Sequence, residues 1–335
     1  MSSKRRAEAR SGAAVLSLLA TSPNAFLLRS LAERPSTLGE LQGLGVSPAS
    51  TLRARLRELI DAAAVLAHHD PGRPRLPAVY ELSTAGRELL PVAEALGRWL
   101  EACPLGGRSL GGEGGKAAVG ALTAAWSATM LRALAVRPLS VAELDSLIVN
   151  LSYPHLERRI AAMRFAGQVE ARPAAGRETP YGATDWLRAA AAPLLAAIRW
   201  ERAHSLAGSA PVAGLDVEAL FLLAGPLARL ESGASGKCRL AVVLSPSGNG
   251  GHGPVGVVAR LRDGSVASCS SRLDGATDAW ASGSLGAWLA ALLDDDTAAL
   301  ELGGDSGLAR DLVDALHATL FERERGVARL GTPAI

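Results

Sequence analysis

Two long segments of the chain, residues 15–33 and 119–136, carry apolar side chains at intervals of three and four residues. This spacing is typical of an amphipathic helix, because it places the apolar side chains on one face. Each segment ends before an Arg-Pro pair, and the residue before a proline disfavours helical backbone. The pattern therefore predicts one long helix in each segment.

The same succession of shorter elements follows each long helix. A short helix comes first, over 37–42 or 141–146, and a third helix then opens on a proline, which suits the first helical turn because its missing N–H costs nothing there. A strand, a Pro/Gly/Arg loop, a return strand and a final helix complete the set. The strands and the final helix are marked by AVLAHH, Tyr80 and Trp99 in the first set, and by GQVEAR, Tyr181 and Trp200 in the second.

The two sets of elements are an internal repeat. LLRSLAERPSTLGEL (27–41) aligns with MLRALAVRPLSVAEL (130–144) at an offset of 103. A repeat of about 100 residues indicates two copies of a domain rather than a solenoid of short units. Between the copies, LGGRSLGGEGGK (105–116) has six glycines in twelve positions and is expected to be a flexible linker.

The pattern changes after the second copy. A helix is expected in DVEALFLLAGPLARL, and KCRLAVVLS, GPVGVVARLR and SVASCSSRL are expected to be three strands. The last two strands are joined by Asp263-Gly264, a strong hairpin signal. TDAWASGSLGAWLAALL is expected to be helical, AALELGG to be a strand or a turn, and SGLARDLVDALHATLF to be a closing helix. These elements predict a small α+β domain.

Both copies resemble known regulators. Residues 15–102 resemble the MarR/HxlR-type winged-helix transcriptional regulators through LLRSLAERPSTLGEL, the third helix S-P-…-L-x-x-R-L-R-E-L, and the return P-x-V-Y-E-L-S-T-A-G-R-E-L. Residues 119–204 resemble the family more loosely, through AWSATMLRALAVRP and LERRIAAM. The third part resembles the sterol-carrier-protein-like domain of some of these regulators, through W-x(7)-W-L-A-A-L-L and L-E-L-G-G-D-S-G-L-A.

The resemblance implies an α+β protein of two tandem winged helix-turn-helix domains followed by a sterol-carrier-like domain. The expected boundaries are 1–104 for the first winged helix, 105–116 for the linker, 117–208 for the second winged helix and 212–330 for the last domain. Two tandem copies would imitate the two-fold symmetry of a dimer, which suits paired half-sites on DNA. Both a monomer with this internal pseudo-symmetry and a homodimer are compatible with it.

The third helix of the first copy is the candidate DNA-reading element. On a helical wheel Leu52, Leu56 and Leu59 form a core stripe, and Ser50, Arg53, Ala54 and Arg57 fall on the opposite side. Two arginines one turn apart can bind guanine edges or phosphates bidentately. The resemblance also makes this helix the recognition helix. Arg73 and Arg75 in the wing loop would contact flanking phosphates or the minor groove. A merely solvated arginine face is the alternative.

The third helix of the second copy is less basic. Its outer face shows Glu157 and Arg158, and Arg177 in its wing is the other candidate contact. Direct DNA contact and a purely structural role both stay open for this copy.

The last domain carries the candidate ligand site. A sterol-carrier-like fold has an apolar cavity under its sheet, so the resemblance implies a hydrophobic small-molecule effector. Trp280, Trp288 and Leu292 would line such a cavity, and the alternative is that they are plain core residues.

Composition and charge limit the function classes. The 335 residues are 48% apolar and 20% charged, which is a globular composition. Net charge is +4 over residues 1–110, +3 over 111–210 and −5 over 211–335, which places the basic surplus in the two copies. The three cysteines lack CxxC spacing, so neither a disulfide framework nor a zinc site is expected. The expected compartment is the reducing cytoplasm. No apolar run reaches 18 residues, so no membrane span is expected.

Other motifs do not support an enzyme. GASGKC (233–238) lacks the full phosphate-loop pattern, and GNGGHGPVG (248–256) lies between strands. His68-His69 and Asp294-Asp295-Asp296 lack further ligands, so no metal and no cofactor is expected, and no nucleophile–base pair is apparent. The sequence therefore predicts a cytoplasmic transcriptional regulator that binds double-stranded DNA. The alternatives are a sequence-independent DNA-organising protein and a lipid-carrier or protein-interaction module that no longer binds DNA.

Overall fold

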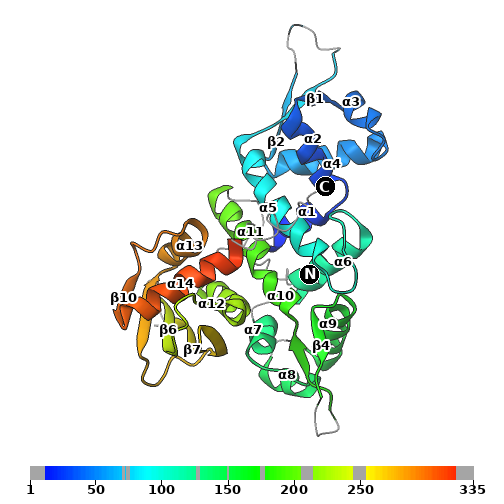
Figure 1. The fold of residues 1–335 in the computed structure, drawn as a ribbon. Coiled ribbons are helices and arrows are strands. Elements are labelled where there is room, and N and C mark those ends of the chain that lie inside the picture. The colour runs from blue at the N-terminus through cyan, green and yellow to red at the C-terminus, as the bar shows by residue number, and fades with distance from the viewer. Residues whose placement is uncertain are drawn as a thin grey trace, which may run out of the picture. The chain divides into compact units, whose positions relative to one another are not determined.

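The computed structural model describes residues 12–69, 72, 76–125, 129–148, 151–173, 178–204, 214–243 and 254–321 (Figure 1). The fold is of the mixed α+β class. The chain divides into two compact units, Met1–Ala124 with Ala196–Pro211, and Ala125–Leu195 with Val212–Ile335. The second copy of the repeat thus shares a unit with the C-terminal sheet. The expected three-domain division stays a prediction.

The first long segment is two helices rather than the single one expected. Helix α1 (Ala13–Ala20) and helix α2 (Asn24–Glu33) are bent by 81° at the break between them. Pro23 explains the correction, because proline lacks an N–H and disfavours helical backbone in the residue before it. The Asn24 side chain donates to the Leu18 carbonyl at 2.8 Å and ties the two helices together.

The remaining elements of the first copy follow the predicted order. They are β1 (Ser36–Thr37), α3 (Leu38–Gly43), α4 (Ala49–Asp61), β2 (Val65–His68), β3 (Val79–Leu82) and α5 (Thr84–Glu101). Strands β1, β3 and β2 form an antiparallel sheet in that order. Helix α3 begins with a capping box, in which Thr37 and Glu40 satisfy each other's backbone N–H groups.

The glycine-rich stretch 105–116 is not the flexible coil expected. Its backbone folds back on α5, where the Arg108 N–H donates to the Leu100 carbonyl at 3.0 Å. Its last residues begin helix α6 (Glu113–Ala125). A Cβ at Gly115 would lie 2.3 Å from the Ser109 carbonyl oxygen, so glycine here allows close packing of two backbones rather than disorder.

The described elements of the second copy repeat those of the first. They are α7 (Thr129–Val136), α8 (Val141–Leu147), α9 (Tyr153–Phe165), β4 (Val169–Ala171), β5 (Tyr181–Ala183), α10 (Asp185–Ala189) and α11 (Ala191–His204). The capping box recurs at the start of α8, now with Ser140 and Glu143. Residues 126–128, within the predicted long helix, lie outside the described residues.

The C-terminal part is a five-stranded sheet with helices. Its elements are α12 (Gly214–Ala224), the 3₁₀ turn Gly225–Leu227, β6 (Gly236–Val243), β7 (Val255–Arg262), β8 (Ser265–Ser270), β9 (Ala279–Ser284), α13 (Leu285–Asp294), β10 (Glu301–Gly304) and α14 (Ser306–Phe321). The strand order is β10-β9-β6-β7-β8, and β9 runs parallel to β6 while the other pairs are antiparallel.

The predicted helix over 277–293 is therefore wrong in its first part. Ala279–Ser284 is a strand, and α13 begins only at Leu285, where the Ser284 hydroxyl accepts from the Ala287 N–H. The predicted hairpin at Asp263-Gly264 is confirmed, with both residues at positive φ. AALELGG supplies the edge strand β10.

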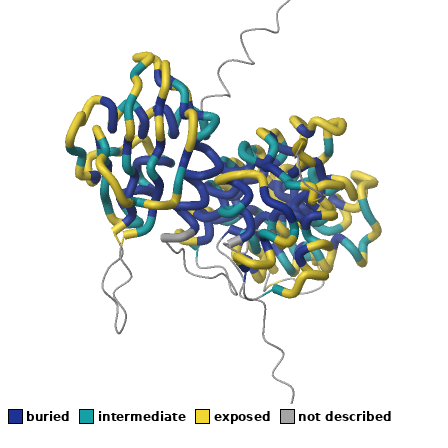
Figure 2. The backbone as a smooth tube through the Cα atoms, turned by 90° about the horizontal axis from the view of Figure 1, so that it is seen from below, coloured by how far each residue is buried: buried dark blue, intermediate teal, exposed yellow. Residues whose placement is uncertain are grey.

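One face of this sheet packs against the helices. Cys238, Leu240 and Val242 alternate along β6 and are buried under α12, α13 and α14. The Trp288 Nε1 of α13 donates to the Ala241 carbonyl at 2.8 Å, and its ring meets Phe221 of α12 edge-on at 4.7 Å. Buried residues run along the inner helices and strands, and exposed residues gather at the turns (Figure 2).

Helix α12 also contacts the second copy. The Arg132 guanidinium on α7 donates to the Glu218 carboxylate on α12 at 2.7 Å, and Glu218 is almost fully buried. Arg188 on α10 donates to the carbonyls of Leu222 and Ala135. These contacts hold the second copy and the C-terminal sheet in one unit.

The end of helix α11 completes the first unit. The Glu201 carboxylate, itself buried, accepts from the Gly12 N–H at 2.7 Å and the Val15 N–H at 3.1 Å, and so caps α1. The Trp200 Nε1 donates to the Ala85 carbonyl at 2.8 Å. The first copy therefore needs residues from the last helix of the second copy.

Candidate nucleic-acid interface and ligand pocket

Helix α4 is held by its apolar stripe. Leu52, Leu56 and Leu59 are at most 1% exposed, which confirms the helical wheel. The turn from α3 uses Gly45 at φ +72°, a left-handed conformation that favours glycine. Pro48 then precedes the first helical residue. This arrangement fixes which face of α4 is turned outward.

The outward face of α4 is basic, and its two arginines have no partner among the described residues. Ser50, Arg53 and Arg57 are exposed, with the small Ala54 between the arginines. Neither Arg53 nor Arg57 makes a hydrogen bond or ion pair with any described residue. Arg55, in contrast, is half-buried and pairs with Glu58. The helix thus separates one structural arginine from two unpaired cations one turn apart.

Three of the predicted DNA contacts lie in the wing loops. Arg73 and Arg75 in the first copy and Arg177 in the second lie outside the described residues. The described strands β2 and β3 flank the first of these loops. The His68 Nε2 and a Glu81 carboxylate oxygen form an exposed hydrogen bond across that hairpin at 2.8 Å.

Helix α9 has the same place in the second copy as α4 has in the first, but a different outer face. Leu156, Ile160 and Met163 are buried, as the wheel predicts. Arg158 is exposed and its Nε donates to the Pro154 carbonyl at 3.2 Å, next to the exposed Glu157. Phe165, which the sequence reasoning did not select, is 80% exposed on this helix. The outer face of α9 is therefore close to neutral and partly apolar.

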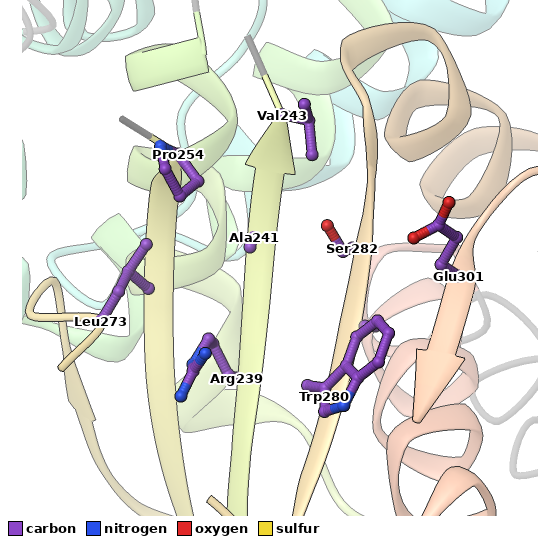
Figure 3. A pocket seen from close by; sticks show the side chains of 9 residues that line it. Arg239, Ala241, Val243, Pro254, Leu273, Trp280, Ser282 and Glu301 are labelled. Atoms are coloured by element: carbon purple, nitrogen blue, oxygen red, sulfur yellow. The ribbon is translucent and has the colours of Figure 1, made fainter. Parts of the chain in front are cut away.

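A pocket of about 540 Å³ lies on the other face of the C-terminal sheet from the buried one (Figure 3). Trp280 lines it, together with Arg239, Leu273 and Glu301. Trp288 and Leu292 do not, because both are buried under the sheet on its helix-covered face. Of the three predicted ligand residues, the structure brings only Trp280 to this pocket. Arg239 and Glu301 were missed, because locating them requires the strand register.

Two buried cysteines of the C-terminal sheet have thiols that are poor nucleophiles. Burial raises the pKa of the Cys238 and Cys269 thiols to about 12, so both stay protonated at neutral pH. Within the described residues, no group of three or more His, Cys, Asp or Glu side chains could hold a metal ion.

Membrane spanning has little support in the described ranges. No single helix there is long and apolar enough to cross a bilayer, and α1 with α2 reach that length only as a sharply bent pair.

Comparison with known proteins returned no match, whether to protein-family models, to curated proteins or to solved structures.

Proposed function

We propose that the protein is a cytoplasmic transcriptional regulator of the MarR/HxlR-like winged-helix type, and that helix α4 enters the major groove of double-stranded DNA. The observation that carries this proposal is the pair of exposed arginines on the outer face of α4, which have no partner among the described residues. The order of elements supports it, since α2, α3 and α4 followed by the β2–β3 hairpin is the order of a winged helix.

The surroundings of the two arginines favour DNA over mere solvation. Ser50 and Ala54 are small, so they let the backbone of α4 approach a groove wall closely. Glu58, the acidic residue one position after Arg57, is occupied by Arg55 and does not neutralise the outer pair. Two guanidinium groups that make no ion pair within the described part of the chain can contact guanine edges or phosphates directly.

The proposal assigns the two copies different tasks. The outer face of α9 carries one glutamate, one arginine and an exposed phenylalanine, which is a poor surface for phosphate contacts. The first copy would therefore do most of the DNA reading, and the second would connect it to the C-terminal domain. In this proposal that domain binds a hydrophobic small-molecule effector, and the chain acts either as a pseudo-dimeric monomer or as a homodimer.

The test is DNA binding by the variant R53Q/R57Q, measured by fluorescence anisotropy on a duplex selected by the wild-type protein from a random pool. If both arginines contact phosphates, we expect the slope of log affinity against log salt to fall by about 1.8, because each phosphate contact contributes about 0.9. If they read bases, each loss costs about 1–3 kcal/mol and relaxes specificity.

The matched control is R87Q/R98Q, which removes the same charge from the exposed surface of α5 in the same unit. We expect it to change affinity far less. Equal affinity of R53Q/R57Q and wild type would remove α4 from the interface. Equal affinity of the wild type for selected and random duplexes would favour the DNA-organising alternative.

A protein-interaction module is the second candidate function. The observation that favours it is the exposed Phe165, together with exposed Leu147 and Tyr153 on the second copy. If the wild-type chain does not bind DNA at low salt, the protein-interaction module is the favoured function.

A further inference from the structure

We infer that the pocket on the C-terminal sheet binds an amphipathic organic carboxylate, with Arg239 holding the carboxylate. This deepens the effector part of the proposed function by naming the site and the ligand class.

The pocket exists because small residues line its floor. Ala241 on β6 and Ser282 on β9 are opposite each other in the sheet, and Gly256 on β7 faces Ala241 on its other side. Larger side chains rise around them, namely Trp280, Leu273 and Val243 (Figure 3). The hollow is therefore built into the sequence of the strands.

Trp280 is held flat along the sheet. Its register partner on β10 is Gly303, and a Cβ there would lie 2.3 Å from carbon atoms of the indole. Glycine at 303 thus lets the ring lie over the neighbouring strand, where it forms a wall of the pocket instead of filling it. A flat aromatic wall suits the apolar part of a ligand.

Arg239 supplies a fixed cation beside this wall. Its Nη2 donates to the Gly275 carbonyl at 2.9 Å, which anchors the guanidinium. Its Nε is buried and has no acceptor, and no carboxylate of the described residues pairs with it. A buried donor without an acceptor is costly, so a ligand oxygen that reached this guanidinium would be bound strongly.

Charge on this face favours an anion over a neutral or cationic ligand. Lys237 on β6 and Arg260 on β7 are directly opposite each other on the same face, one step along β6 from Arg239. Glu301 lies on the far side of Trp280 from Arg239 (Figure 3). A carboxylate would lie at the Arg239 end, and its apolar part would extend over Ala241 between Leu273 and Trp280.

The volume fits a ligand of modest size. About 540 Å³ falls within the range of roughly 300–1,000 Å³ that is usual for small-molecule sites. Decanoate is a suitable probe, because its uncharged counterpart decanol has the same chain and separates the charge from the apolar contribution.

The experiment titrates the full chain with decanoate and with decanol, without DNA, by isothermal titration calorimetry. We expect saturable binding of one decanoate, weakened about tenfold or more in R239M because a charge-assisted hydrogen bond is lost. We expect decanol to bind wild type and R239M alike. The matched control R310M removes an exposed cation from α14, on the helix-covered side of the same sheet, and should change decanoate affinity less than about twofold.

Two further variants and readouts locate the site. A241L places a large side chain on the pocket floor and should abolish decanoate binding. The circular dichroism spectrum and the melting temperature of this variant show whether it folds. In the wild type, decanoate should shift the Trp280 indole resonance, assigned with W280F.

Absence of saturable decanoate binding overturns the inference, as does equal affinity in R239M and wild type. Neither result bears on the proposed DNA binding, because R53Q/R57Q lies in the other unit and is tested without ligand. Failure of R53Q/R57Q to weaken DNA binding would likewise leave this site intact.

Discussion

The substitution E201A should destabilise the first unit far more than the loss of an exposed side chain near the end of a helix usually does. The Glu201 carboxylate accepts from the N–H groups of Gly12 and Val15, which are the N-cap and the third residue of α1. Helix α1 has no capping side chain of its own. Glu201 therefore does for α1 what the glutamate and hydroxyl of a capping box do for α3 and α8, but from a different helix.

The size of the effect follows from these two hydrogen bonds. Each buried N–H that is left without an acceptor costs about 1–3 kcal/mol. The carboxylate also stabilises the positive end of the helix dipole, a contribution of about 0.3–1 kcal/mol that disappears with it. We expect E201A to lower the free energy of unfolding of the first unit by about 3 kcal/mol, or its melting temperature by roughly 10 °C.

Differential scanning calorimetry of the full chain measures this effect, since the two compact units need not unfold together. Hydrogen exchange at the Val15 amide gives a local readout, and its protection should fall in E201A. The control is E88A, because Glu88 forms an exposed pair with His204 at 2.8 Å in the same unit. Such a pair contributes at most about 1 kcal/mol. Melting of E201A within about 1 °C of E88A would refute the capping role.

Two further predictions concern the second unit. Burial raises the pKa of Glu218 above its ordinary value of 4.5, and the ion pair with Arg132 opposes this increase only in part. Protonated Glu218 therefore contributes stability that is present below pH 4.5 and is lost as the pH rises through the pKa of the folded state. Urea unfolding measures the free energy of unfolding of wild type and E218Q from pH 4.5 to 7, and the wild type should lose stability relative to E218Q as the pH rises. A difference in unfolding free energy that stays constant over this range would contradict the prediction. G303A should displace the Trp280 indole, because the new methyl group would lie 2.3 Å from it, and should shift tryptophan emission towards exposed values. The control G97A adds a methyl group where nothing lies within 4 Å and should leave emission unchanged.

Local patterns were sufficient to predict the third helix of each copy and its buried face. The stripe of Leu52, Leu56 and Leu59 repeats with the helical period, and burial of that stripe fixes the direction of Arg53 and Arg57 without any tertiary information. The capping boxes at Thr37 and Ser140 likewise depend on residues three apart. Features determined within one or two helical turns are therefore readable from sequence.

Features that depend on pairing between distant segments were missed. Ala279–Ser284 is a strand because it lies parallel to β6, about forty residues earlier, whereas its own apolar run continues without a break into α13. Short apolar runs do not separate strand from helix by periodicity alone. The pocket follows from the same register, which brings Arg239 beside Trp280, and no local pattern indicates that neighbourhood.

The dependence of α1 on Glu201 also sets an order of events during synthesis. The carboxylate lies 189 residues after Gly12, on the last helix of the second copy, so nearly all of that copy lies between them. At translation rates of about 5–20 residues per second, α1 waits roughly 10–40 s on the ribosome before its cap is made. The nascent first copy therefore stays incomplete while the second copy emerges. A fragment that stops at residue 124 would preserve that unfinished state, so the shortest piece suited to isolating the first copy must carry residues 196–211 as well.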